Sequence, residues 1–190
     1  VEGTDEEKWV LICNLNPGGP FGGSATQYFI GGFDGKTFTS DTDASGRIPT
    51  KWMDFGKDHY ATVSWSGTPQ SRRTVIGWMS NWQYAAEVPT TQYRSANTLP
   101  RDLSLFRAPD GEIYLASAPA AELTVLRGTL ACKAKKATAG KKPRVFELPA
   151  AQRGICEILL DIDARKADSV SIDITNKAGE RVALTYNPPA

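Results

Sequence analysis

Short apolar segments recur at close spacing along this chain, and turn-forming residues separate them. Residues 9–14 and 26–31 are rich in aromatic and β-branched side chains, and a glycine- and proline-rich stretch at 17–23 lies between them. Asp34-Gly35 then marks a tight hairpin turn. Further strands are predicted at 59–65, 74–79, 103–107 and 113–117. This pattern predicts an all-β fold, and it fits the blades of a propeller as well as it fits a sandwich.

The character of the sequence changes near residues 116–121, where aromatic residues become scarce and small residues dominate. Beyond this point apolar and polar residues alternate at 156–162, 170–175 and 182–186. Such alternation predicts three half-buried strands. We therefore expect two domains, residues 1–118 and residues 119–190.

Composition limits the classes of partner. The chain has 190 residues, of which 41% are hydrophobic and 23% charged, so it can bury a core as one large domain or as parts of two. A net charge of +1 gives no general attraction for nucleic acid or for a membrane surface. No apolar run approaches the length needed to span a bilayer.

The sequence implies no metal and no cofactor. Cys13, Cys132 and Cys156 are widely spaced, and the single histidine, His59, cannot complete a zinc-ligand pattern with them. We expect free and mostly buried thiols, and a disulfide between two of them stays open.

Two segments dense in aromatic, acidic and amide residues stand out, at 52–61 (WMDFGKDHYA) and at 76–84 (IGWMSNWQY). A sugar ring has apolar C–H faces and a rim of hydroxyls, so a site for it combines aromatic platforms with carboxylates and amides in fixed directions. The competing interpretation is that the aromatics belong to the core and that Asp or Asn beside Gly forms turns.

These two segments and the later TLPRDL at residues 98–103 resemble, in order and spacing, the later propeller blades of glycoside hydrolase family 32. That family contains invertases, inulinases and levanases. The resemblance is strong over about residues 8–118 and weaker beyond. It implies part of a five-bladed β-propeller followed by part of a β-sandwich, and an enzyme that releases fructose from levan, inulin or sucrose.

The resemblance also shows what this segment lacks. The family's aspartate nucleophile (NDPNG), hydroxyl-binding aspartate (RDP) and glutamate acid/base (EC) motifs do not occur in these residues. Asn14–Gly18 resembles NDPNG but has no carboxylate at the nucleophile position. Arg101-Asp102 is followed by Leu103 instead of the proline of RDP, and Cys156-Glu157 has the EC pair in reverse order. A retaining glycosidase needs two carboxylates about 5 Å apart. We therefore expect an internal segment of a longer enzyme, whose missing blades are its partner within the same polypeptide.

Motif position in the family implies roles for three substrate-binding residues and for no catalytic one. Trp82 is expected to form an apolar wall against the sugar, and Tyr60 to place a hydroxyl near the nucleophile and the ring. Asp58 is expected to bond sugar hydroxyls or to orient Tyr60. Asp54 is interpreted as a turn residue and His59 as a packing or surface residue. Trp78 is expected to face between blades, and Trp52 and Trp65 to lie in the core.

Several alternatives stay open. The chain could be a non-catalytic module that binds fructan, a β-domain whose aromatics are all core, or part of a related five-bladed hydrolase of arabinans or xylans. If the protein degrades polysaccharides, an extracellular, periplasmic or cell-surface location is favoured.

Overall fold

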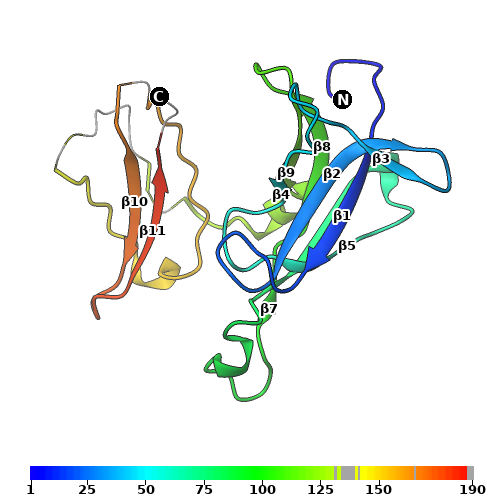
Figure 1. Ribbon diagram of the computed structural model, residues 1–190. Helices are drawn as coiled ribbons and strands as arrows, with labels where there is room; N and C mark the ends of the chain where they lie inside the picture. Colours follow the sequence, from blue (N-terminus) through cyan, green and yellow to red (C-terminus); the bar gives the residue numbers. More distant parts are fainter. Residues whose placement is uncertain (131, 134–139, 141, 165, 188–190) are drawn as a thin grey trace. The chain divides into compact units, whose positions relative to one another are not determined.

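The computed structural model describes residues 1–130, 132–133, 140, 142–164 and 166–187, and its regular structure is almost entirely β (Figure 1). The chain forms two compact units, Val1–Leu126 and Arg127–Ala190. The strands of the first unit are β1 (Trp9–Leu15), β2 (Ala25–Phe33), β3 (Phe38–Ser40), β4 (Lys51–Trp52), β5 (Tyr60–Ser64), β6 (Arg73–Met79), β7 (Ala96–Asn97), β8 (Arg101–Arg107) and β9 (Ile113–Pro119). Three short 3₁₀ turns accompany them: η1 (Pro69–Ser71), η2 (Ala85–Glu87) and η3 (Ala121–Leu126).

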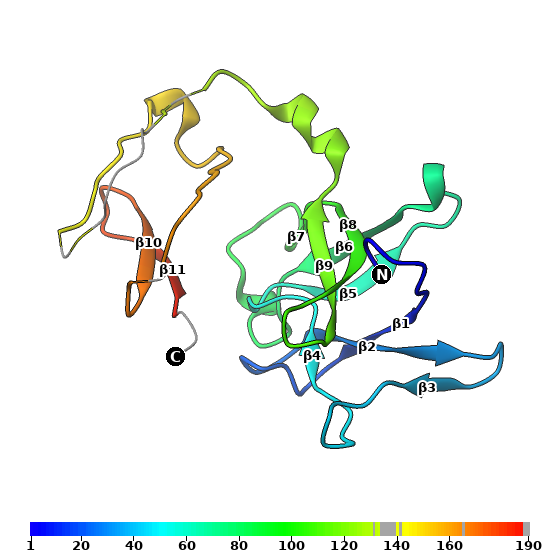
Figure 2. The same ribbon diagram turned by 90° about the horizontal axis from the view of Figure 1, so that it is seen from above.

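Two antiparallel sheets make up the first unit (Figure 2). In the first sheet β2 is central: it pairs with β1 along one edge, and with β3 and β4 at different points of the other edge. The second sheet has the order β5-β6-β8-β9, and β7 pairs with β6 beside β8. Sequentially adjacent antiparallel strands of this length are typical of propeller blades.

The core lies between the two sheets. Its buried members are Tyr28 and Ile30 of β2, Met53 after β4, and Ile113 of β9. Partly buried residues of β1, β8 and β9 pack against them. The alternating pattern of β2 therefore places one of its faces against the second sheet.

The strands predicted for the first unit are confirmed, with ends that differ by one or two residues. Two details of burial differ. Trp65, expected in the core, follows β5 and is 46% exposed. Trp52 is only half-buried. Both lie at strand ends, where the neighbouring strand covers less of a side chain.

The first unit extends past the expected domain boundary at residue 118. The backbone N–H of Ala120 donates to the carbonyl of Pro100 at 2.9 Å. Arg72 bridges Asp102 of β8 at 2.7 Å and Glu122 of η3 at 2.6 Å. These contacts attach η3 to the second sheet. The division of the chain into two domains at residue 118 remains a prediction.

The second unit contains the hairpin of β10 (Val170–Thr175) and β11 (Arg181–Tyr186) and the 3₁₀ turn η4 (Ala150–Gln152). The strand predicted at 156–162 is wrong, because these residues form no strand and are exposed. Alternation creates an apolar face, but a strand also needs a neighbouring strand to bond its backbone groups. The described residues of this unit provide no such neighbour for 156–162.

The three cysteines are free thiols, as expected. Their burial was predicted wrongly, since Cys132 and Cys156 are exposed and only Cys13 of β1 is partly buried. Among the described residues, no helix has the length and apolar character needed to cross a membrane.

Candidate functional site

Three aromatic side chains form a row at one end of the second sheet. Tyr60 of β5 lies opposite Trp78 of β6 in the strand register, with ring centroids 6.3 Å apart. Trp78 in turn contacts Trp82, with ring centroids 4.9 Å apart. Trp82 follows β6 and is 60% exposed, so it offers an open aromatic surface. Two of the three predicted sugar-contacting residues therefore belong to one continuous aromatic row.

Trp78 joins the two outer members of this row. Its expected position between blades stays a prediction, and within this unit it lies between Tyr60 and Trp82 and contacts both. Aromatic pairs at these separations stabilise each other beyond simple burial of area. Trp78 therefore supports the two outer rings of the row.

A local irregularity of β5 sets the position of Tyr60. The pairing of β5 with β6 shifts its register between Tyr60 and Val63, and Ala61 adopts a positive φ of 51°. Such a bulge turns the strand and redirects the side chains on either side of it. No turn residue in the sequence signals it.

Asp58, the third predicted residue, lies at the entry to β5 and accepts a hydrogen bond from the hydroxyl of Tyr84. Its hydroxyl partner is thus Tyr84 rather than Tyr60. Burial raises the pKa of the Asp58 carboxyl, Lys57 opposes this, and Asp54 adds to the rise. Lys57 also donates to the side-chain oxygen of Gln83 at 2.7 Å.

Asn81, immediately before Trp82, is fully buried. Its amide nitrogen donates to the carbonyls of Gly22, Ser24 and Lys57 at 3.1–3.2 Å. Its side-chain oxygen accepts from the backbone N–H of Gln83 at 3.0 Å. Asn81 therefore joins the glycine-rich loop, the segment before β5 and the segment after β6. Sequence reasoning assigned roles to neither Asn81 nor Tyr84, because their partners are remote in sequence.

Asp54 fulfils the turn role expected of it, since its carboxylate accepts from the N–H of Gly56 at 2.8 Å. It has a second role that the sequence did not reveal, an ion pair with Arg101 of β8 at 2.6 Å. Burial alone would raise the pKa of Asp54, but the bonds from Arg101 and Gly56 outweigh it and lower that pKa. The ion pair ties the TLPRDL segment to the segment that carries Asp58.

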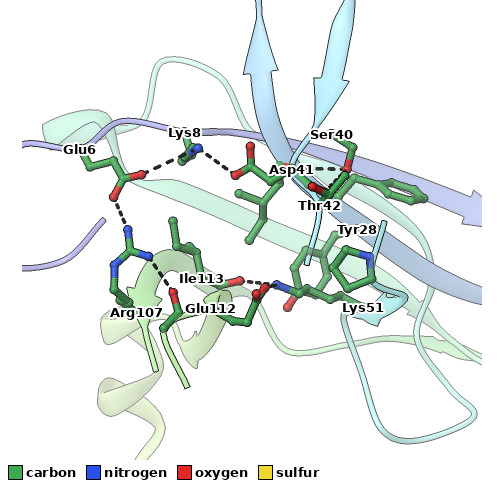
Figure 3. A pocket seen from close by; sticks show the side chains of 14 residues that line it. Glu6, Lys8, Tyr28, Ser40, Asp41, Thr42, Lys51, Arg107, Glu112 and Ile113 are labelled. Atoms are coloured by element: carbon green, nitrogen blue, oxygen red, sulfur yellow. Dashed lines mark hydrogen bonds and ion pairs between the residues drawn. The ribbon is translucent and has the colours of Figure 1, made fainter. Parts of the chain in front are cut away.

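The first unit also has a cavity of about 470 Å³, lined by the N-terminal segment, β2 and the β8–β9 hairpin (Figure 3). None of the three predicted sugar-contacting residues lines it. Its charged groups pair with one another, as Lys8 with Asp41, Arg107 with Glu6, and Lys51 with Glu112. Because its charges are already paired, this cavity is a less favourable candidate for a ligand site than the open aromatic row.

Comparison with known proteins identifies the family. The family model described as "Glycosyl hydrolases family 32 N-terminal domain" matches residues 1–119. The chain belongs to glycosyl hydrolase family 32. The expected fold class is thereby confirmed: all-β, with part of a β-propeller followed by part of a β-sandwich.

Similarity to individual proteins supports the assignment of this chain to family 32. The extracellular exo-inulinase of Aspergillus niger is 49% identical over 109 residues, which cover 55% of this chain and 20% of that protein. The levanase of Bacillus subtilis is 43% identical over 127 residues, covering 66% and 18% respectively. The crystal structure of exo-inulinase from Aspergillus awamori superposes with a TM-score of 0.57 at 43% identity, covering 62% of this chain and 23% of that one. The chain thus spans about a fifth of the length of these relatives.

Proposed function

We propose that this chain forms part of the substrate pocket of a glycoside hydrolase that releases fructose from levan, inulin or sucrose. The observation that carries the proposal is the row Tyr60–Trp78–Trp82 with Asp58 nearby, in a chain of family 32. An aromatic wall beside groups that donate and accept hydrogen bonds suits the faces and rim of a sugar ring. The relatives named inulinase and levanase support fructans as the substrate class.

In this proposal Trp82 packs against an apolar face of the fructosyl unit, and Tyr60 directs its hydroxyl toward the ring. Asp58 bonds sugar hydroxyls, and its bond from Tyr84 sets the direction of its carboxylate. None of the three is a nucleophile or a general acid.

The reaction we propose proceeds with retention through a fructosyl-enzyme intermediate, which needs a nucleophilic carboxylate and an acid/base carboxylate. The family's motifs for both do not occur among these residues. We infer that other blades of the same polypeptide supply them, so activity belongs to the assembled propeller. The relative from Aspergillus niger is named extracellular, which supports an extracellular location for this protein too.

The test measures hydrolysis by the protein as its source organism produces it, with levan, inulin and sucrose as substrates and arabinan as the comparison. We expect fructose release from at least one fructoside and no sugar release from arabinan. Fructan binding without release would instead support the non-catalytic module. Sugar release from arabinan alone would overturn the fructan assignment.

Trp82→Ala tests the site itself. Loss of a large apolar contact should lower kcat/KM on the preferred fructoside by roughly 10- to 100-fold. Trp9→Ala is the matched control, because Trp9 is 58% exposed, much as Trp82 is, but packs against Phe33 in the first sheet. Equal losses in the two variants, or no loss in Trp82→Ala, would contradict the proposed site.

A further inference from the structure

The fully buried side chain of Asn81 is the most highly bonded group beside the aromatic row. Its two amide hydrogens are shared among three carbonyl oxygens, those of Gly22 at 3.2 Å, Ser24 at 3.1 Å and Lys57 at 3.1 Å. Its oxygen accepts from the N–H groups of Gln83 at 3.0 Å and Ser24 at 3.4 Å. Both halves of the amide are therefore in use.

Only an amide of this size satisfies all these partners. An aspartate would set a carboxylate against three carbonyl oxygens, and alanine would leave those carbonyls and two N–H groups without their partner in a buried place. A glutamine has one methylene too many for a site with no exposed surface.

Most residues bonded to the Asn81 side chain are adjacent in sequence, or hydrogen-bonded, to the predicted sugar-contacting residues. Trp82 follows Asn81 in sequence, and the backbone N–H of Trp82 donates to the hydroxyl of Ser24 at 3.2 Å. Lys57, whose carbonyl Asn81 holds, precedes Asp58. The direction of the Trp82 ring and the position of Asp58 thus depend on one buried amide.

We propose that Asn81 is a positioning residue of the sugar site, which fixes Trp82 and the Lys57–Asp58 segment against the glycine-rich loop. The inference rests on the proposed function where it is tested by kcat/KM. A second test needs no activity, because it measures the contact of Trp82 with Trp78. Asn81 touches no substrate in this arrangement and acts through Trp82 and Asp58.

A matched control distinguishes positioning from plain structural support. Asn14 also joins separate segments: its side-chain oxygen accepts from the Thr62 N–H at 2.8 Å and from the Thr26 hydroxyl at 2.8 Å. It links β1, β2 and β5, and its bond to Thr62 lies within the bulge that positions Tyr60, but it is not bonded to Trp82 or to the Lys57–Asp58 segment. Asn14→Ala should lower stability and leave the Trp78–Trp82 contact in place.

The first test is a double-mutant cycle on kcat/KM for the preferred fructoside, in the full protein as its source produces it. We expect Asn81→Ala to lower kcat/KM by roughly tenfold or more. Because Asn81 also holds the Lys57–Asp58 segment, Asn81→Ala should still lower kcat/KM in the Trp82→Ala background, but by at least about threefold less than it does in the parent. Any loss of kcat/KM in Asn14→Ala acts at the Tyr60 end of the row, so it should multiply independently with that of Trp82→Ala. Independent, multiplicative losses from Asn81→Ala and Trp82→Ala would overturn the proposal.

The second test is far-ultraviolet circular dichroism, in which the strong indole transitions of two tryptophan rings in contact couple to each other. Trp82→Ala defines the part of the spectrum due to the Trp78–Trp82 pair, whose centroids are 4.9 Å apart. Asn81→Ala should lose this part and Asn14→Ala should keep it, and retention in folded Asn81→Ala would overturn the proposal. If the parent neither binds nor cleaves fructan, the proposed function fails while this readout still decides the positioning role.

Asn81→Ser keeps the inference testable if Asn81→Ala does not fold. Its short hydroxyl can keep part of the bonding of Asn81 but cannot reach the carbonyls of Gly22, Ser24 and Lys57 together. We expect a smaller loss of kcat/KM, about threefold, with a weakened tryptophan signal. No change in either quantity would overturn the proposal.

Discussion

At the residue scale, His59 shows how a side chain of catalytic type serves packing. It is 2% exposed, and its Nε2 lies 3.0 Å from the hydroxyl of Thr62. Its ring lies against the backbone of Gly77, where an added Cβ would come within 2.9 Å of Cε1. The packing role expected for His59 is therefore confirmed, and no larger residue than glycine fits beside it.

The buried histidine predicts a pH-dependent stability. Burial lowers the pKa of His59 below its ordinary 6.5, Arg101 lowers it further, and Asp54 partly opposes them. The folded state thus favours the neutral ring, so its contribution to stability is fully present above pH 6.5 and is lost as the pH falls through the lower, folded pKa. Urea unfolding at a series of pH values from 7.5 downward should show this decrease.

His59→Gln provides the comparison, since glutamine can still bond Thr62 but does not titrate. The variant should be less stable at neutral pH, and the decrease just below pH 6.5 should become shallower. As the chain has a single histidine, an unchanged pH profile in the variant would refute this assignment.

At the scale of elements, the loop between β1 and β2 is as constrained as a strand. Gly23 has φ of +67°, and a Cβ there would lie 2.0 Å from the side-chain oxygen of Asn81. The sequence indicated a turn-rich loop at 17–23 but not its close approach to the segment after β6. That approach depends on the packing of the two sheets, which no local pattern records.

Gly23→Ala should therefore be much more harmful than an alanine at an ordinary turn glycine. We expect a loss of about 2–4 kcal/mol in the free energy of unfolding, from backbone strain and from displacement of Asn81. Gly35→Ala is the control: Gly35 has φ of +94°, but an added Cβ would meet nothing within 4 Å. Its loss should be about 1 kcal/mol, and equal losses in urea unfolding would show that the Asn81 contact is unimportant.

At the scale of the whole molecule, the two units differ in how much they bury. The first unit has a core of buried residues between two sheets. In the second unit every described residue of β11 is exposed, including Val182, Leu184 and Tyr186. A two-stranded hairpin is only marginally stable by itself in water.

Hydrogen exchange on this 190-residue chain should reveal the difference. Amides of β2 that face β1, such as those of Gln27 and Phe29, should exchange at least about tenfold more slowly than the paired amides of β10 and β11. Equal protection in the two units would mean that the second unit gains stability from contacts beyond its hairpin.

Local sequence alone determined most strands of the first unit and the family. Strand formation there follows period-two patterns and turn residues that lie within a few positions of each other. The motifs at 52–61, 76–84 and 98–103 are similarly local, and their residues suffice to indicate family 32. Where the pattern had no partner strand, at 156–162, the same reasoning failed.

Only the tertiary structure decided how the candidate site is assembled. Asn81 bonds Gly22 and Lys57, which are 59 and 24 positions away in sequence, and Asp54 pairs with Arg101 across 47 positions. Hydrogen bonds and ion pairs depend on distances of a few ångströms in space, and sequence separation does not specify them. The residue types of a sugar site can therefore be read from the chain, but their mutual support arises only when the two sheets pack together.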